Sequence, residues 1–314
     1  MCIRDSPFYR DGAKERNPNE ARERDRMPLK SLSDREYRAL VSLLADDDLK
    51  VLHTIWEHLL EVGPPALAYL REASEDPDPR TRLRARHIMA QIVLEDLESQ
   101  FQALAAHSDE GFSLEDGVFT IARVEYADLD RDHFRQQIED LAAPLRARIE
   151  ALVEPEEIVG TLNAYLFEEL RFTGSSSDYY NPDNTYLNRV LERRTGIAIS
   201  LCALYILVAE RLGLPVKGVG LPGHFLVKYD APATEIYIDP HNSGRLLSRK
   251  ECVQCLTGAG YYLKEEYIAS STSRDIVIRM LRNLVLIYSK LQDKARVRRL
   301  THYVEVLQTR EKTR

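Results

Sequence analysis

Four residues in the second half of the chain have the types and the order that nucleophilic catalysis needs. Ser200 and Cys202 lie in one apolar run, His224 follows as an isolated imidazole, and Asp239 comes fifteen residues later. A hydroxyl or thiol becomes a usable nucleophile when an adjacent imidazole accepts its proton, and a carboxylate can orient that imidazole. The sequence therefore offers Ser200 and Cys202 as candidate nucleophiles for one candidate His–Asp pair.

Each candidate nucleophile also has a structural interpretation. Ser200 lies near the start of an expected helix, where capping a backbone N–H is the favoured role of its hydroxyl. Cys202 lies about half a turn further along an apolar helix, where a small buried core residue is favoured. His224, between a Gly and a Phe, has no evident packing need for an imidazole. The His–Asp pair is therefore the stronger part of the candidate site.

The residues around these four predict one helix and one sheet. Residues 197–212 are apolar nearly all round, which is typical of a central buried helix. Residues 214–219, 224–229 and 235–239 are β-branched or aromatic runs between Gly and Pro turns, so they are predicted to be strands of one antiparallel sheet. A hairpin between the last two strands would bring the imidazole within about 2.6–3.2 Å of the carboxylate.

Further residues are predicted to line a cleft near the imidazole. Asn242 follows the aspartate closely enough to cap the strand end, line the cleft or orient the imidazole, as an amide does in some cysteine proteases. Tyr179 and Tyr180 follow a Gly/Ser-rich loop and are candidate cleft walls, with an aromatic packing patch as the alternative. His241, beside the asparagine, is expected to face solvent.

The rest of the chain predicts helices on both sides of this core. Residues 28–110 hold short helices broken by Gly-Pro and Asp-Pro turns, a pattern that resembles HEAT-type repeats. Residues 111–270 are the predicted core, and residues 271–314 an antiparallel helix pair and tail. Residues 1–27 are polar and lack apolar periodicity, so we expect a disordered leader. Its opening MCIRDS is similar to translated adapter sequence, which makes part of the leader a candidate artefact.

The composition is that of an ordinary globular protein with an acidic balance. Apolar residues make up 44% of the 314 and charged residues 30%, and 50 acidic against 43 basic residues give a net charge of −7. This balance argues against nucleic acid as the main partner. No apolar run reaches about 18 residues, so no membrane span is expected.

The four cysteines are too few for a disulfide framework in a chain of this length, which predicts a reducing cytoplasm. Cys252 and Cys255 lie one helical turn apart, but no second Cys or His pair completes a zinc site. We therefore predict no metal and no cofactor.

Four stretches of the sequence together resemble one protein family. Three of them read LNAYLFEELRFTGSSSDYYNPDNTYLNRVLERR, GIAISLCALYILVAERLGLPVKGVGLPGHFLVKY and YIDPHNSGRLLS, and these are similar to the transglutaminase-like core of the bacterial SirB family. The fourth, RMLRNLVLIYSKLQDKARVRRL, is similar to the tetratricopeptide-like unit that often closes it. The resemblance covers roughly residues 111–307. It implies an α+β, predominantly helical fold whose papain-like core packs a central helix on a small antiparallel sheet.

The resemblance also implies a thiol at the start of the central helix, a His on the second strand and an Asp on the third. His224 and Asp239 match, but the helix start reads IAIS and holds no thiol. In active relatives the helix dipole and the facing imidazole lower the pKa of that thiol. We therefore predict a non-catalytic or weakly catalytic module that binds a protein or peptide, because stacked helix pairs present grooves. The alternative is a hydrolase or acyltransferase that uses Ser200 or Cys202 with the His–Asp pair. A third interpretation is a regulatory scaffold whose cleft is vestigial, and the oligomeric state is left open.

Overall fold

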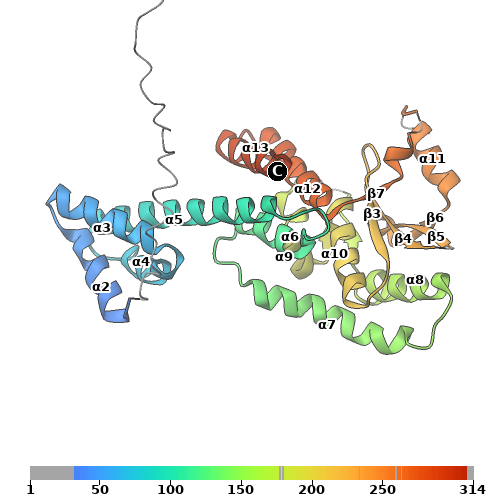
Figure 1. Ribbon diagram of the computed structural model, residues 1–314, viewed down its shortest axis with the longest axis horizontal. Helices are drawn as coiled ribbons and strands as arrows, with labels where there is room; N and C mark the ends of the chain where they lie inside the picture. The colour runs from blue at the N-terminus through green and yellow to red at the C-terminus, as the bar shows by residue number, and fades with distance from the viewer. Residues whose placement is uncertain are drawn as a thin grey trace, which may run out of the picture. The chain divides into compact units, whose positions relative to one another are not determined.

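The computed structural model describes residues 32–309 apart from 177, 179, 233, 259 and 263. The chain forms two compact units, which divide between Ile92 and Val93 inside one long helix (Figure 1). The expected leader lies outside the described residues. The predicted α+β class with mostly helical structure is confirmed, while the four-part division of the chain stays a prediction.

The first unit is a group of helices with its own apolar core. Leu59 and Leu70 are fully buried there, and Gly63 with the prolines that follow ends one helix and begins the next, as the sequence predicted. The HEAT-like character of this unit stays a prediction. Its helical segments are α2 (Asp34–Ser42), η1 (Leu43–Ala45), α3 (Leu49–Val62), η2 (Pro64–Ala66), α4 (Leu67–Ala73) and α5 (Pro79–Ala106), the last of which continues into the second unit.

Helix α10 (Ala198–Arg211) is the centre of the second unit. Every residue from Ile199 to Ala209 is buried, which confirms the prediction of a helix that is apolar all round. Residues 155–169 form an α-helix followed by a π-helical turn. The helical segments that precede α10 in this unit are α6 (Leu114–Arg123), α7 (Arg131–Ile149), α8 (Pro155–Asn163), η3 (Ala164–Glu169), η4 (Pro182–Asn184) and α9 (Leu187–Arg193).

A five-stranded antiparallel sheet packs against α10, with the strand order β6-β5-β4-β3-β7. The three predicted strands are confirmed, although the second begins at Leu226 and leaves His224 in the turn before it. The two outer strands were not predicted, because they are only three and two residues long. The strands are β3 (Val216–Val219), β4 (Leu226–Ala231), β5 (Thr234–Asp239), β6 (Arg245–Leu247) and β7 (Ser270–Ser271).

Short segments connect the sheet to the helices on either side. Strand β1 (Thr173–Gly174) pairs in parallel with β2 (Thr195–Gly196), and β2 comes directly before α10. The segment η5 (Pro240–Asn242) joins β5 to β6, and α11 (Arg249–Gly258) and η6 (Glu265–Tyr267) lie between β6 and β7.

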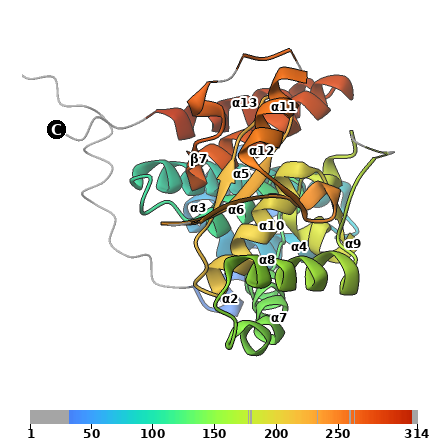
Figure 2. The same cartoon turned by 90° about the vertical axis from the view of Figure 1, so that its right-hand side faces the viewer.

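The C-terminal helices α12 (Ser273–Lys290) and α13 (Lys294–Gln308) lie side by side, as Figure 1 and Figure 2 both show. This confirms the predicted helix pair, while its tetratricopeptide-like character stays a prediction. Met280 and Leu284 of α12 belong to the same apolar core as Leu204 and Val208 of α10. The C-terminal pair is therefore packed into the unit that holds the candidate site.

Candidate functional site

The Ser200 hydroxyl is enclosed at the start of α10. It accepts the backbone N–H of Ile197 at 3.1 Å and lies 2.6 Å from the carbonyl oxygen of Asn184, to which it donates. The Ile197 carbonyl, at 3.0 Å, is a second acceptor, and the side chain is fully buried. These contacts join the start of α10 to the segment before α9. Among the described residues, no hydrogen bond of Ser200 involves His224. Capping, the structural role that the sequence favoured, accounts for the hydroxyl.

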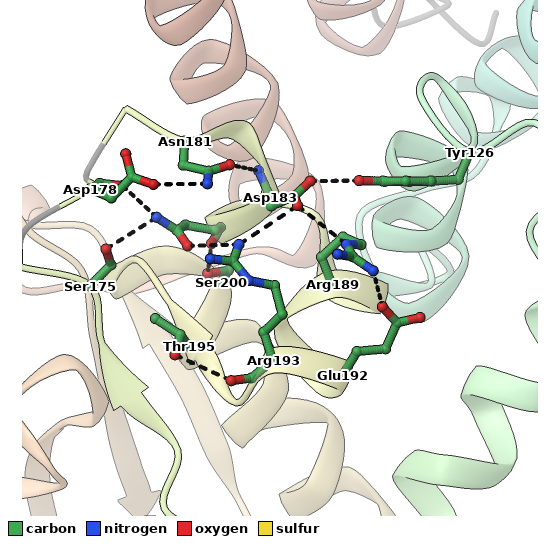
Figure 3. Close-up of polar contacts among 11 residues, drawn as sticks. Tyr126, Ser175, Asp178, Asn181, Asp183, Arg189, Glu192, Arg193, Thr195 and Ser200 are labelled. Atoms are coloured by element: carbon green, nitrogen blue, oxygen red, sulfur yellow. Dashed lines mark hydrogen bonds and ion pairs between the residues drawn. The ribbon is translucent and has the colours of Figure 1, made fainter.

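The loop that Ser200 contacts is held by a network of polar side chains (Figure 3). Asp183 accepts the Tyr126 hydroxyl at 2.5 Å and forms an ion pair with Arg193 at 3.7 Å. Asn184 donates to the hydroxyl of Ser175 at 3.1 Å. These hydrogen bonds and the ion pair hold the segment before α9 in place against the start of α10.

Cys202 is also fully buried, and its sulfur lies 3.5 Å from the carbonyl oxygen of Phe225. Burial, helped by the negative charge of Asp239, raises the pKa of the Cys202 thiol well above its ordinary value. Because the thiolate is the nucleophilic form of cysteine, this environment disfavours nucleophilic chemistry at neutral pH. A small core residue, the favoured interpretation from the sequence, accounts for Cys202.

The structure brings His224, Asp239 and Asn242 together at the end of β5. The His224 Nε2 atom lies 2.9 Å from Oδ2 of Asp239, which confirms the predicted contact between imidazole and carboxylate. The Asn242 side-chain amide donates to the same oxygen at 2.7 Å, although Asn242 is otherwise exposed. Asn242 therefore positions the carboxylate rather than the imidazole.

The Asp239 carboxylate has four hydrogen-bond partners and is only 4% exposed. Its second oxygen accepts the backbone N–H groups of His241 at 3.1 Å and Asn242 at 3.3 Å. Burial works to raise the pKa of Asp239, but the hydrogen bonds and charge of His224, with those of Asn242, outweigh it and hold the pKa below its ordinary value. An ionised Asp239 therefore orients the imidazole at neutral pH.

The turn that carries His224 is tied to α12. The His224 N–H bonds to the carbonyl of Leu221 at 3.2 Å, and Gly223 between them has a φ of +76°, which favours glycine. Arg279 of α12 donates to the carbonyl oxygens of Leu221 at 2.6 Å and His224 at 2.7 Å, and its guanidinium lies 5.1 Å from the Phe225 ring centroid. Arg279 was missed from the sequence, because a single arginine in an amphipathic helix gives no signal of a partner 55 residues away.

His241 is half-buried, and the expectation that it faces solvent is wrong. Its Nε2 lies 3.4 Å from the carbonyl oxygen of Ser175, and its ring meets the His224 ring edge-on with centroids 6.0 Å apart. Backbone also approaches closely here, because a Cβ at Gly174 would lie 2.4 Å from the His241 carbonyl oxygen. Since β1 pairs with β2, which directly precedes α10, His241 connects the His–Asp pair to the start of that helix.

The His224, Asp239 and Asn242 side chains line a pocket of about 400 Å³. Arg245 of β6 and the exposed Cys255 of α11 line the same pocket. The remaining walls are apolar and come from Leu221, Pro222, Leu226, Leu247 and Leu256, with the backbone of Gly223. Ser200 and Cys202 are not among the lining residues.

Of the two tyrosines predicted as cleft walls, the structure describes Tyr180, and Tyr180 does not line this pocket. Tyr179 lies outside the described residues. Tyr180 is 43% exposed, and the ammonium of Lys290 in α12 lies 3.7 Å from its ring centroid. Tyr180 therefore belongs to a cation–π contact with the C-terminal helices, which the local sequence could not indicate.

Among the described residues, no group of three or more His, Cys, Asp and Glu side chains is placed to hold a metal ion. Cys252 is on the buried side of α11 while Cys255 of the same helix is exposed, so the two thiols have different surroundings. No helix of the described ranges is both long and apolar enough to cross a membrane.

The family of this chain follows from its similarity to known proteins. A family model described as the transglutaminase-like superfamily matches residues 132–282. A UPF0162 protein of Xylella fastidiosa (strain 9a5c) is 35% identical over 195 residues, which cover 60% of this chain and 69% of that protein. The chain belongs to the UPF0162 family of transglutaminase-like proteins. Protein SirB1 of Salmonella typhimurium is 28% identical over 132 residues, or 42% of this chain and 49% of SirB1, so the predicted SirB-like assignment is confirmed.

The similarity extends beyond bacterial proteins. F-box only protein 21 of Homo sapiens is 34% identical over 137 residues, which cover 41% of this chain but only 21% of that protein. The shared segment is therefore one part of a longer chain in that relative. No solved structure matches the chain.

In this UPF0162 chain the central helix has no thiol where the transglutaminase-like pattern places one. Helix α10 begins at Ala198, which is half-buried, and the next polar side chains along it are the enclosed Ser200 and Cys202. The site thus combines a hydrogen-bonded His–Asp pair with a helix whose first side chain is the methyl group of Ala198.

Proposed function

We propose that this protein is a non-catalytic or weakly catalytic transglutaminase-like module that binds another polypeptide at the pocket around His224. The proposal is carried by one observation: the His–Asp pair lines an open pocket, while both candidate nucleophiles are buried with partners of their own. A base without a protein nucleophile beside it cannot form an acyl-enzyme. The same groups can still bind a ligand by hydrogen bonding.

The contacts of the two candidate nucleophiles support this proposal. A catalytic serine donates its proton to the imidazole, but the Ser200 proton is directed at the Asn184 carbonyl. A catalytic cysteine needs a lowered thiol pKa, but burial raises that of Cys202. Either residue would have to leave the core to reach a substrate.

The pocket itself supports polypeptide binding. Its volume of about 400 Å³ falls in the lower part of the roughly 300–1,000 Å³ typical of ligand sites. Its mostly apolar walls with a few polar groups suit a side chain and its adjoining backbone. The occurrence of a similar segment within an F-box only protein is consistent with a module that works beside other domains. The free thiols support the proposal of a reducing, cytoplasmic location.

A selection from a random peptide library tests the proposal. Peptides would be selected on the immobilised wild-type protein, and their affinities measured by fluorescence anisotropy for wild type, His224→Ala and the control His133→Ala. His133 is an exposed histidine on α7 that does not line the pocket. We expect the His224 variant to lose about 1–2 kcal/mol of binding free energy and the control to lose none. Equal affinities for all three proteins would reject the pocket as the binding site.

The enzymatic alternative has its own distinct outcome. Wild type and His224→Ala would be treated with a fluorophosphonate and with iodoacetamide, and labelled residues mapped by mass spectrometry. We expect no His224-dependent labelling of Ser200 or Cys202. Labelling of either residue that disappears in the variant would replace the binding proposal with a hydrolase or acyltransferase.

A further inference from the structure

The carboxylate that lines the pocket, Asp239, is satisfied by hydrogen bonds, whereas the guanidinium of Arg245 is exposed. Asp239 is the acidic residue of the lining, and its oxygens are occupied by His224, by Asn242 and by two backbone N–H groups. With 4% of its surface exposed, it presents almost no acceptor to a ligand. The pocket therefore has little capacity to bind a cationic group.

Arg245 and His224 are the lining side chains that can carry a positive charge. The Arg245 side chain is 65% exposed, and its one ion pair among the described residues is with Glu251 at 3.5 Å, an exposed contact of the kind that contributes little. His224 uses Nε2 for Asp239, which leaves Nδ1 for a ligand. Nδ1 donates to a carboxylate when the ring is protonated, and it is an acceptor when the ring is neutral with its proton on Nε2. A guanidinium and an imidazole on one pocket are the groups that bind a carboxylate.

The apolar walls set the second requirement on the ligand. Leu226, Leu247 and Leu256 come from β4, β6 and α11, so three different elements close around the same space. In a pocket of about 400 Å³ these walls leave room for one large side chain with its backbone. A single ligand residue must then supply both the apolar side chain and the carboxylate.

We propose that the pocket binds the free C-terminus of a polypeptide whose last residue is apolar. Only at a C-terminus do an apolar side chain and a carboxylate belong to one residue, since Asp and Glu side chains are themselves polar. The side chain would pack among the leucines while the terminal carboxylate pairs with Arg245 and His224. This assignment rests on the proposed function and names the class of its ligand.

A matched set of peptides tests the assignment. The probes are hexapeptides with an N-terminal fluorophore that end in Leu as the free acid, in Leu as the carboxamide, or in Ser as the free acid, and a fourth with an internal Leu-Asp pair. Affinities would be measured for wild type, Arg245→Gln and the control Arg249→Gln. Arg249 forms an exposed ion pair with Glu265 and does not line the pocket.

We expect the Leu free acid to bind at least about tenfold more tightly than the carboxamide, since hydrogen bonds to charged groups contribute most. Arg245→Gln should remove most of that difference, and Arg249→Gln should preserve it. Protection of Cys255 from iodoacetamide by the bound peptide would place it in the pocket, because Cys255 lines it and is exposed.

Equal binding of acid and carboxamide, or tighter binding of the internal Leu-Asp peptide, would overturn the C-terminal assignment. If the library selection still yields peptides that depend on His224, the binding function stands and only the ligand class is wrong. If that selection yields none, the proposed function fails as well.

Discussion

Replacing Ser200 with alanine separates a structural hydroxyl from a catalytic one. The substitution removes a hydrogen bond accepted from the Ile197 N–H and one donated to the Asn184 carbonyl, each worth about 1 kcal/mol net. The Ile197 N–H and the Asn184 carbonyl still bond to each other at 3.1 Å, so neither is left unpaired. Alanine also favours the helix by about 0.5 kcal/mol over serine. We therefore expect the free energy of unfolding to fall by about 1–2 kcal/mol.

The measurement is urea unfolding followed by circular dichroism, with linear extrapolation to water. Ser289→Ala is the matched control, because Ser289 also lies on a helix of this unit and donates to the Val285 carbonyl, but it is exposed. Its loss should stay within about 0.5 kcal/mol. A Ser200 variant no less stable than the control would refute the reasoning from its buried contacts. Peptide affinity at the pocket should be unchanged, since Ser200 does not line it.

Three further outcomes follow from the contacts of the site. Arg279→Met should destabilise the protein by about 2–3 kcal/mol and speed amide exchange in the turn before β4, because it removes two charge-assisted hydrogen bonds to that turn. The control Arg282→Met, on an exposed part of α12, should do neither. The difference in the free energy of unfolding between wild type and Asp239→Asn should be largest near neutral pH and shrink as the pH falls below 3.8. The reason is that the pKa of Asp239 is depressed in the folded state, so protonation in acid removes the stabilisation. A difference that grows in acid would contradict this sign. Iodoacetamide should alkylate Cys255 well before Cys252, whose thiol has a pKa raised to about 11 mainly by burial. Mass spectrometry of timed samples would give the order of labelling, and earlier labelling of Cys252 would contradict this reasoning.

The parts of the site that the sequence predicted are those within one local pattern. Fifteen residues and two alternating strands are enough to place His224 beside Asp239, and an apolar run is enough to predict burial of Cys202. The position of His224 just before β4, and the half-buried ring of His241, depend on turn geometry that single residues do not specify.

Contacts between distant segments could not be predicted in the same way. Arg279 reaches the His224 turn from α12, and the walls of the pocket include Leu256 of α11, which packs against side chains of the sheet. Periodicity predicts that α12 is a helix but not which of its polar residues points at a carbonyl group. The pocket is therefore a product of tertiary structure.

The contacts of the His–Asp pair also show which of its two members needs a functional explanation. Asp239 caps η5 by accepting the N–H groups of His241 and Asn242, and it is nearly inaccessible, so the fold alone accounts for a carboxylate at this position. His224 is different, because its side chain is 33% exposed and its known partner already has three other donors. An imidazole that is one-third exposed contributes little to a core. We therefore expect a functional role for His224 rather than for Asp239, and the effect of removing His224 on binding relative to stability is the comparison that tests it.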